Sequence, residues 1–129
     1  MLHIERLHHI AIICSNYERS KTFYTEILGF VIENEVFRSD RKSYKLDLSL
    51  NGQYLIELFS FPDPPSRITR PEATGLRHIA FGVKSLEKEL VFLASKGVVA
   101  EKIRIDECTN KKFTFFYDPD NLPIELYEF

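Results

Sequence analysis

The chain has 129 residues, 44% of them hydrophobic and 28% charged, which is the length and composition of one ordinary globular domain over residues 1–129. Its 17 basic and 19 acidic side chains give a net charge of −2, so no basic field predicts binding to nucleic acid or to a membrane. Two cysteines are too few for a disulfide framework and no apolar run reaches membrane-spanning length, so we expect a cytoplasmic protein.

The chain opens with a predicted strand followed by a predicted helix. Residues 8–13, HHIAII, form an apolar run of the length typical of a strand. Residues 16–28 place apolar and polar side chains with the spacing of an amphipathic helix. Asn16 is suited to cap the start of this helix, and Gly29 is suited to end it because glycine tolerates a positive φ.

Three strands are predicted after this helix. In the middle one, polar side chains such as Lys45 and Asp47 alternate with leucines, which is the period-two pattern of a half-buried strand. Asn51 and Gly52 follow it, and both accept the positive φ of a two-residue hairpin turn. The predicted strands cover residues 31–37, 44–50 and 53–60.

A proline-rich segment over residues 61–75 separates these elements from a second set of the same kind. It holds four of the six prolines, so we expect a linker. Ser85 is suited to cap the second helix and Gly97 to end it. The predicted elements are a strand over 77–83, a helix over 85–96, and strands near 99–105, 112–117 and 122–128. Each half is therefore predicted to be βαβββ, with internal repeats over 7–60 and 76–128.

A histidine and a glutamate occupy matching places in the two halves. The tetrapeptide HIAI that begins at His9 reappears as HIAF at His78. The tetrapeptide LIEL, which contains Glu57, is matched by PIEL, which contains Glu125. Glu57 follows His9 by 48 residues, and Glu125 follows His78 by 47. Each half is thus predicted to carry a histidine on its first strand and a glutamate on its last.

Strand periodicity predicts where these polar side chains point. His9 shares a face with Ala11 and Ile13, because alternate residues of a strand lie on one side. Ile10 and Ile12 point to the opposite face, which we expect to pack under the helix. Each glutamate lies between two apolar residues of its strand, so we expect it to face inward. A buried carboxylate is costly on its own, so it requires a cation, a proton or a hydrogen-bond donor.

The four residues have two interpretations. Imidazole and carboxylate are good ligands of divalent first-row metals, and a six-coordinate ion with four such ligands keeps about two positions for water or substrate oxygens. Alternatively, the histidines are ordinary strand residues and the glutamates are edge charges. Two His–Glu pairs at nearly equal spacing favour the metal site, because core packing alone does not explain the joint pattern.

The chain resembles the vicinal oxygen chelate superfamily, and within it the glyoxalase I-like proteins. The resemblance runs from Leu7 to Glu128 and rests on the segments HHIAI, IELF, GLRHIAF and FFYDPDNLPIELYE. The last segment is the most specific, although Asn121 stands where the family usually has glycine. The resemblance implies an α+β fold in which two βαβββ modules form a cup-shaped mixed sheet.

The resemblance also implies a cofactor and a site. The ion would be Ni, Zn, Co, Mn or Fe, and the family's metal ligands fall on His9, Glu57, His78 and Glu125. His8 is the alternative to His9 as the first metal ligand. We prefer His9 because it aligns with His78 and because both are followed by Ile-Ala. The ion would act as a Lewis acid on two vicinal oxygens of the substrate. Glu125 would be the base that moves a proton, with Glu57 able to serve the opposite face.

In a glyoxalase this chemistry converts the hemithioacetal of methylglyoxal and glutathione to S-lactoylglutathione. Two positions depart from the glutathione-using enzymes, because Ile13 replaces their arginine and Phe61 replaces their asparagine. A different thiol adduct or another small oxygenated substrate therefore stays open. So do a small-molecule binding or resistance protein, a thiol transferase and an extradiol-type dioxygenase on the same scaffold. The resemblance also implies a homodimer.

Overall fold

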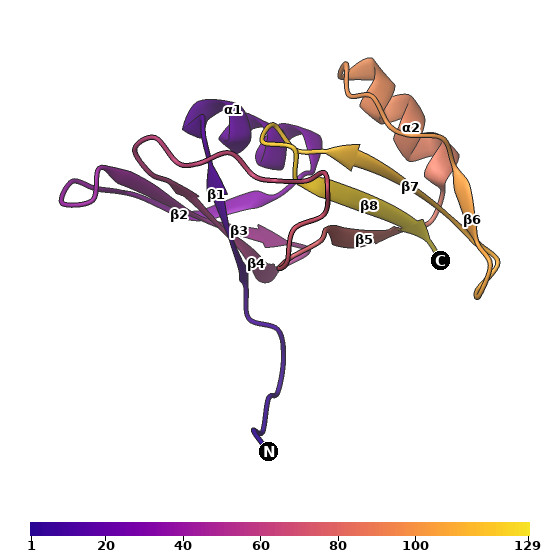
Figure 1. Ribbon diagram of the computed structural model, residues 1–129, viewed down its shortest axis with the longest axis horizontal. Coiled ribbons are helices and arrows are strands. Elements are labelled where there is room, and N and C mark those ends of the chain that lie inside the picture. The colour runs from indigo at the N-terminus through magenta and orange to yellow at the C-terminus, as the bar shows by residue number, and fades with distance from the viewer. The chain divides into compact units, whose positions relative to one another are not determined.

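The computed structural model describes all 129 residues, which form two compact units, Met1–Ser66 and Arg67–Phe129. Each unit contains one four-stranded sheet and one helical segment (Figure 1). The boundary between the units lies inside the predicted linker over residues 61–75. The predicted α+β class with two βαβββ modules is confirmed. Neither helical segment combines the length and the apolar character needed to cross a membrane.

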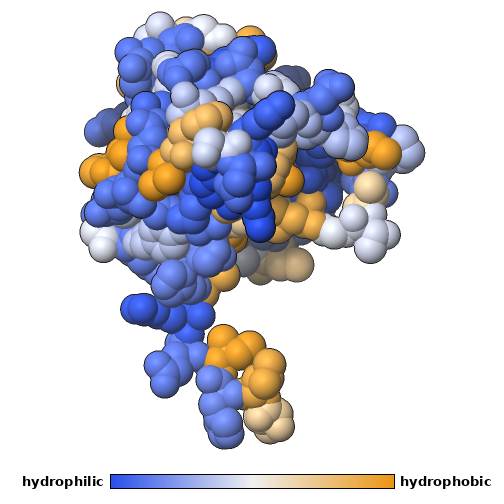
Figure 2. Space-filling model, turned by 90° about the vertical axis from the view of Figure 1, so that its left-hand side faces the viewer, coloured by the Kyte–Doolittle hydropathy of each residue, from blue (hydrophilic) through white to orange (hydrophobic).

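The sheet of the first unit has the strand order β1-β4-β3-β2. Strand β1 runs parallel to β4, and the other neighbours are antiparallel. The elements are β1 (Ile10–Cys14), α1 (Tyr17–Thr22), η1 (Phe23–Ile27), β2 (Val31–Arg38), β3 (Ser43–Leu50) and β4 (Gln53–Ser60). Residues 1–9 precede β1 as an exposed arm, whose apolar end projects away from the rest of the unit in Figure 2.

The sheet of the second unit has the equivalent order β5-β8-β7-β6. Strand β5 runs parallel to β8, which is antiparallel to β7, and β7 is antiparallel to β6. The elements are β5 (Ile79–Val83), α2 (Leu86–Ser95), β6 (Arg104–Asp106), β7 (Lys111–Tyr117) and β8 (Pro123–Glu128). The two sheets therefore repeat one topology, as the sequence repeats predict.

The helix predicted over residues 16–28 begins as expected but changes character midway. Asn16 caps it, because its Oδ1 accepts a backbone N–H of the first turn at 3.1 Å. From Phe23 onward the segment is π-helical. The Thr25 hydroxyl donates to the Lys21 carbonyl at 2.8 Å, so it competes with the backbone for that acceptor. This competition accompanies the widened turn, which amphipathic spacing does not predict.

The strand predicted near residues 99–105 is much shorter, because β6 covers only Arg104–Asp106. The Glu101 N–H still donates to the Phe115 carbonyl at 2.8 Å. The Glu101 carbonyl, however, accepts the Thr114 hydroxyl at 2.7 Å. The Thr114 side chain thus replaces a backbone N–H as the donor to Glu101, and the regular pairing between the strands stops. The prediction of a strand is therefore wrong for the residues before Arg104.

Two turns set the positions of β4 and β8. Asn51 and Gly52 adopt φ values of +52° and +78°, which confirms the predicted hairpin between β3 and β4. Asn121, before β8, has a φ of +67°, the left-handed conformation that glycine adopts without cost. Asp118 holds this turn, because its Oδ1 accepts two backbone N–H groups at 2.9 and 2.8 Å.

The core of each unit lies between the sheet and its helical segment. In β1, Ile12 and Cys14 are buried, whereas Ala11 and Ile13 on the other face are exposed. This confirms the predicted division of faces in β1. We call the face that no helix covers the open face of each sheet. The buried aliphatic strand residues are Ile12, Leu46, Leu48, Ile56 and Leu58 in the first unit and Ile79, Ile124 and Leu126 in the second.

Candidate functional site

His9 and Glu57 come together on the open face of the first sheet. Ala11 of β1 pairs with Glu57 of β4, and His9 lies two residues before Ala11 on the same face. The distance from Nε2 of His9 to Oε2 of Glu57 is 3.7 Å. Only 16% of the Glu57 side chain is exposed. The strand register therefore places the first predicted pair side by side.

His78 and Glu125 repeat this arrangement in the second unit. Ala80 of β5 pairs with Glu125 of β8, and His78 lies two residues before Ala80. Nε2 of His78 is 2.9 Å from Oε2 of Glu125, whose side chain is 14% exposed. Both histidines lie just before the strands predicted to contain them, because β1 and β5 each begin one residue later.

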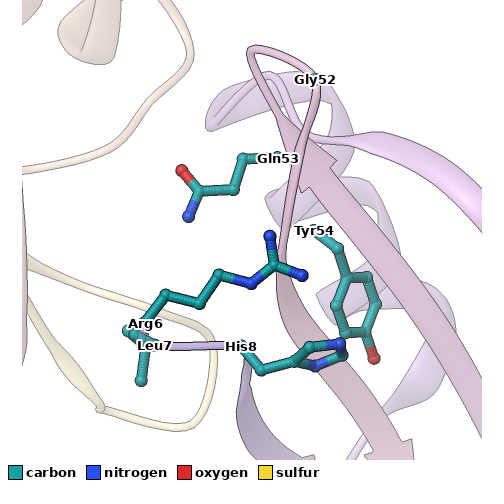
Figure 3. A pocket seen from close by; sticks show the side chains of 6 residues that line it. All are labelled: Arg6, Leu7, His8, Gly52, Gln53 and Tyr54. Carbon is teal, nitrogen blue, oxygen red and sulfur yellow. The ribbon is translucent and has the colours of Figure 1, made fainter. Parts of the chain in front are cut away.

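A pocket of about 280 Å³ lies where the N-terminal arm meets the turn between β3 and β4 (Figure 3). The Arg6 side chain extends into it, between Gln53 and Tyr54. His8 also borders it, and its Nδ1 is 2.8 Å from Nδ1 of His9. The pocket thus adjoins the first pair, in which His9 rather than His8 lies against the glutamate.

Polar neighbours hold Glu57 in place. The Tyr54 hydroxyl donates to Oε2 of Glu57 at 2.8 Å. The Lys45 ammonium lies 3.6 Å from the same oxygen and 2.7 Å from Oδ1 of Asp47. Asp47 opposes Glu57 directly across β3 and β4. A hydroxyl and an ammonium therefore compensate the negative charge of this shielded carboxylate.

The protonation of these neighbours follows from their contacts. Burial raises the pKa of Tyr54, and its hydrogen bond to Glu57 raises that pKa further, so the phenol keeps the proton that it donates. The hydrogen bond to Asp47 raises the pKa of Lys45, which keeps the ammonium charged. Both groups are thus donors to Glu57 at neutral pH.

Sequence periodicity missed Tyr54 as a partner of Glu57. The two residues are three apart in β4, and an unbroken strand would place them on opposite faces. The strand register shifts between Leu48 and Ser49 of β3, so that Ser49 pairs with Tyr54. This irregularity turns the Tyr54 side chain to the open face, and no local sequence signal marks it.

Glu125 has apolar surroundings instead. Phe115 opposes it across β7 and β8, and the Phe115 ring meets the His78 ring edge-on at a centroid distance of 5.1 Å. Phe113 lies two residues along β7, with its ring 6.2 Å from that of Phe115. No hydroxyl or ammonium group contacts Glu125, so His78 is its one polar side-chain partner. The two units therefore surround the same pair with different chemistry.

The donor atoms suit a divalent cation. Each unit supplies one imidazole nitrogen and one shielded carboxylate, which are ligand types that Ni, Zn, Co, Mn and Fe accept. Nδ1 of His78 is buried without a hydrogen-bond partner, which leaves Nε2 as the nitrogen that bonds Glu125. The structure contains no cluster of three or more His, Cys, Asp or Glu side chains able to hold a metal ion. Each unit thus contributes a pair, and the role of both pairs as metal ligands stays a prediction.

Comparisons with known proteins place the chain in a family. A family model described as the Glyoxalase/Bleomycin resistance protein/Dioxygenase superfamily matches residues 6–126. The uncharacterized protein YwkD of Bacillus subtilis strain 168 is 63% identical over 125 residues, which cover 97% of this chain and 98% of that protein. The crystal structure of a glyoxalase family protein from Enterococcus faecalis is 46% identical with a TM-score of 0.91, covering 98% of this chain and all of that one.

A more distant relative has a named activity. The lactoylglutathione lyase of Schizosaccharomyces pombe strain 972 is 30% identical to this chain over 143 residues. The match covers 94% of this chain but 46% of that enzyme. This chain therefore spans about half the length of the lyase that it matches.

Proposed function

The chain belongs to the Glyoxalase/Bleomycin resistance protein/Dioxygenase superfamily, and on that premise we propose that it is a metal-dependent lyase or isomerase of the glyoxalase I type. The observation that supports this most is the repetition of one His–Glu pair at equivalent places in both units. Similarity to the lactoylglutathione lyase of Schizosaccharomyces pombe adds support. The proposed substrate is a small molecule with two neighbouring oxygens, such as the hemithioacetal of a thiol.

The four residues of the two pairs would hold one divalent ion. When bound, this ion supplies a Lewis acid that stabilises negative charge on the substrate oxygens. The chain itself presents its imidazoles and carboxylates on the open faces, where Ala11 and Ala80 leave room beside them. The remaining chemistry, which is the movement of a proton between neighbouring carbons, falls to a carboxylate of the chain.

We assign Glu125 as the base that moves this proton. His78 is its one polar side-chain partner, so the carboxylate breaks few contacts when it turns toward a substrate. Phe115, opposite it across β7 and β8, places an apolar ring on that side of the carboxylate. Glu57, in contrast, is held by Tyr54 and by the Lys45 ammonium, which favours a fixed position.

The proposal extends to the setting in which the chain acts. We expect a homodimer in the cytoplasm, where small thiols stay reduced and form hemithioacetals with 2-oxoaldehydes. Light scattering of the purified protein with and without added Ni²⁺ or Zn²⁺ measures the oligomeric state. A monomer under both conditions contradicts this part of the proposal.

Glutamine variants test the function directly. With hemithioacetals of methylglyoxal, Glu125→Gln is expected to lose at least about 100-fold in turnover, the lower part of the usual contribution of a general base. It is also expected to bind the metal more weakly. Glu107→Gln is the matched control, because Glu107 is exposed in a loop of the same unit.

Three results would each contradict the proposal in a different way. Full turnover and full metal content in both Glu125→Gln and Glu57→Gln remove the assigned site. A wild-type protein that binds one metal ion but isomerises no hemithioacetal favours the small-molecule binding protein on the same scaffold. A wild-type protein that binds no divalent ion removes the metal from the mechanism.

A further inference from the structure

Arg38, at the end of β2, carries a charge that no acidic side chain neutralises. We propose that Arg38 binds a carboxylate group of the substrate, whose reacting oxygens lie at the His9–Glu57 pair. The inference rests on the proposed function for the chemistry at that pair, and on the geometry of Arg38 for the carboxylate.

Two phenylalanine rings fix the position of the guanidinium. The Cζ atom of Arg38 lies 4.8 Å from the ring centroid of Phe59 and 5.7 Å from that of Phe61. The two rings are stacked at 5.8 Å with an interplanar angle of 21°. Cation–π contacts with both rings hold the planar group in one orientation before any ligand arrives, which lowers the entropy cost of binding.

Most donors of this guanidinium have no acceptor in the protein. Nη2 of Arg38 donates to the hydroxyl of Ser43 at 2.8 Å. Nε of Arg38 is shielded from solvent and has no hydrogen-bond partner. An unsatisfied, shielded donor on a charged group is costly. A carboxylate accepts two parallel N–H groups from a guanidinium, and so it matches the donors that remain.

A second arginine shows that this lack of a partner is particular to Arg38. Arg104 lies on two phenylalanine rings of the other sheet in the same manner, with Cζ 4.9 Å from Phe113 and 5.5 Å from Phe115. Arg104, however, has Oε1 of Glu101 at 3.6 Å. Stacking on aromatic rings is therefore common to both arginines, and only Arg38 is left without a carboxylate.

The strand register places Arg38 on the same open face as the first His–Glu pair. Arg38 opposes Ser43 of β3, and Ser43 shares its face with Asp47, four residues along the strand. Asp47 in turn opposes Glu57. Phe59, under the guanidinium, follows Glu57 by two residues, or about 7 Å of strand. A molecule with its reacting oxygens at Glu57 thus extends roughly 7 Å along the strand to reach the level of the guanidinium, whose Cζ lies 4.8 Å from the Phe59 ring centroid.

These distances indicate a substrate class. A short thiol that ends in a carboxylate, such as 3-mercaptopropionate, forms a hemithioacetal whose carboxylate and hydroxyl are separated by a comparable length. The neutral 3-mercaptopropanol has the same chain without the charge. The structure therefore assigns Arg38 the role of selecting the anionic member of such a pair.

Direct binding measurements test the assignment without requiring turnover. The zinc-loaded protein is titrated with 3-mercaptopropionate, with 3-mercaptopropanol and with inorganic phosphate, while proton–nitrogen spectra follow the Nε–H signals of the arginines. We expect the carboxylate thiol to move the Arg38 signal and to bind about 10- to 100-fold more tightly than the alcohol, as for a charge-assisted hydrogen bond. Phosphate that binds more tightly than the carboxylate overturns the assigned class.

Variants separate the charge of Arg38 from its packing. Arg38→Met keeps the contacts with the phenylalanines and is expected to abolish the preference for the carboxylate thiol. Arg38→Lys keeps the charge without the planar fork and is expected to retain part of the preference. Arg41→Gln removes an equal charge from the exposed turn that follows β2, and it is expected to behave as the wild type. Backbone spectra of each variant verify the fold.

Several outcomes would overturn the inference. Arg38→Met with an unchanged preference removes Arg38 from the site, and so does an Nε–H shift at Arg6 or Arg104 in place of Arg38. Loss of the homodimer in Arg38→Met shows that the arginine pairs with a second copy of the chain. A carboxylate preference that depends on Arg38 in a protein without hemithioacetal turnover keeps this site and removes the lyase. If the hemithioacetals of 3-mercaptopropionate and 3-mercaptopropanol turn over with equal efficiency, the lyase is kept and the carboxylate site at Arg38 is removed.

Discussion

The Tyr54 hydroxyl donates a 2.8 Å hydrogen bond to the Glu57 carboxylate, and no hydroxyl does the same for Glu125. The two glutamates occupy equivalent places in β4 and β8, so their backbones do not distinguish them. Their neighbours do, because a phenol and an ammonium anchor Glu57 while a phenylalanine lies opposite Glu125. The anchored Glu57 carboxylate is suited to hold an ion, and the Glu125 carboxylate is suited to turn toward a substrate.

Removal of the phenol is expected to weaken metal binding. Tyr54→Phe leaves Glu57 without its hydroxyl donor, and loss of such an outer contact typically costs about 10- to 100-fold in metal affinity or activity. Competition between the protein and a chelating dye for Zn²⁺ measures the affinity. Tyr44→Phe is the matched control, because Tyr44 stacks on Tyr17 of the helix that covers the other face. Equal affinities in both variants would show that Tyr54 has no part in the site.

Stability is expected to depend on pH through Glu35. Hydrogen bonds from Lys21 and Tyr17 lower the pKa of Glu35 in the folded state. A carboxyl group of this kind stabilises the fold above its ordinary pKa, and that stability is lost as the pH falls through the lowered value. At neutral pH we expect Glu35→Gln to lose about 0.5–1 kcal/mol of unfolding free energy, because the pair is partly exposed.

Denaturant titrations at several pH values measure this effect. The difference between Glu35→Gln and the wild type is expected to shrink as the pH falls below the range in which glutamate is ionised. Glu26→Gln removes an equal charge from the helical segment that carries Tyr17 and Lys21, and it serves as the control. A difference that stays constant down to acidic pH would assign the loss to packing rather than to ionisation.

The core under α1 is expected to tolerate truncation poorly. Leu58 is fully buried in β4, and Leu58→Ala removes methyl groups and leaves a cavity, which costs about 2–5 kcal/mol. Val31→Ala, at a position that is 60% exposed in β2 of the same sheet, is expected to change stability by less than about 0.5 kcal/mol. Urea unfolding of both variants measures the contrast. Similar losses in the two variants would show that Leu58 does not belong to the core.

The turn before β8 is expected to accept glycine better than alanine. Asn121 has a φ of +67°, a backbone conformation that costs conformational energy in any residue with a Cβ. Asn121→Ala is expected to lose about 1 kcal/mol of unfolding free energy, whereas Asn121→Gly is expected to be neutral or slightly stabilising. Thermal unfolding of both variants gives the comparison. Equal stability of the two would show that backbone strain at this turn is negligible.

Local chemistry in the sequence was sufficient to predict much of the fold. Asn16 and Ser85 cap the two helices as expected, because their side chains accept backbone N–H groups at 3.1 and 3.4 Å. The turn at Asn51 was predictable because a left-handed φ limits the residue types that fit. The equivalence of the two His–Glu pairs followed from the repeat spacing, whereas the parallel pairing of β1 with β4 and of β5 with β8, which brings each histidine beside its glutamate, is seen only in the structure.

Features that depend on contacts across strands were not predictable. The π-helical turn coincides with a hydrogen bond from the Thr25 hydroxyl to the Lys21 carbonyl, and amphipathic spacing carries no sign of that bond. The early end of the predicted strand near residues 99–105 follows from Thr114 on a different strand. Tyr54 reaches Glu57 only because the register of β3 against β4 shifts. Each outcome is set by a partner distant in sequence, which single-segment patterns do not contain.

The unequal surroundings of the two pairs also bear on how such a chain evolves. Duplication of one ancestral segment produces two equal copies, each of which must serve every task of its carboxylate. In this chain the two copies differ, because Tyr54 and Lys45 anchor Glu57 whereas Phe115 lies opposite Glu125, so that the two carboxylates are suited to separate tasks. A descendant lineage can then change one copy to accept new molecules while the other preserves the inherited donor atoms.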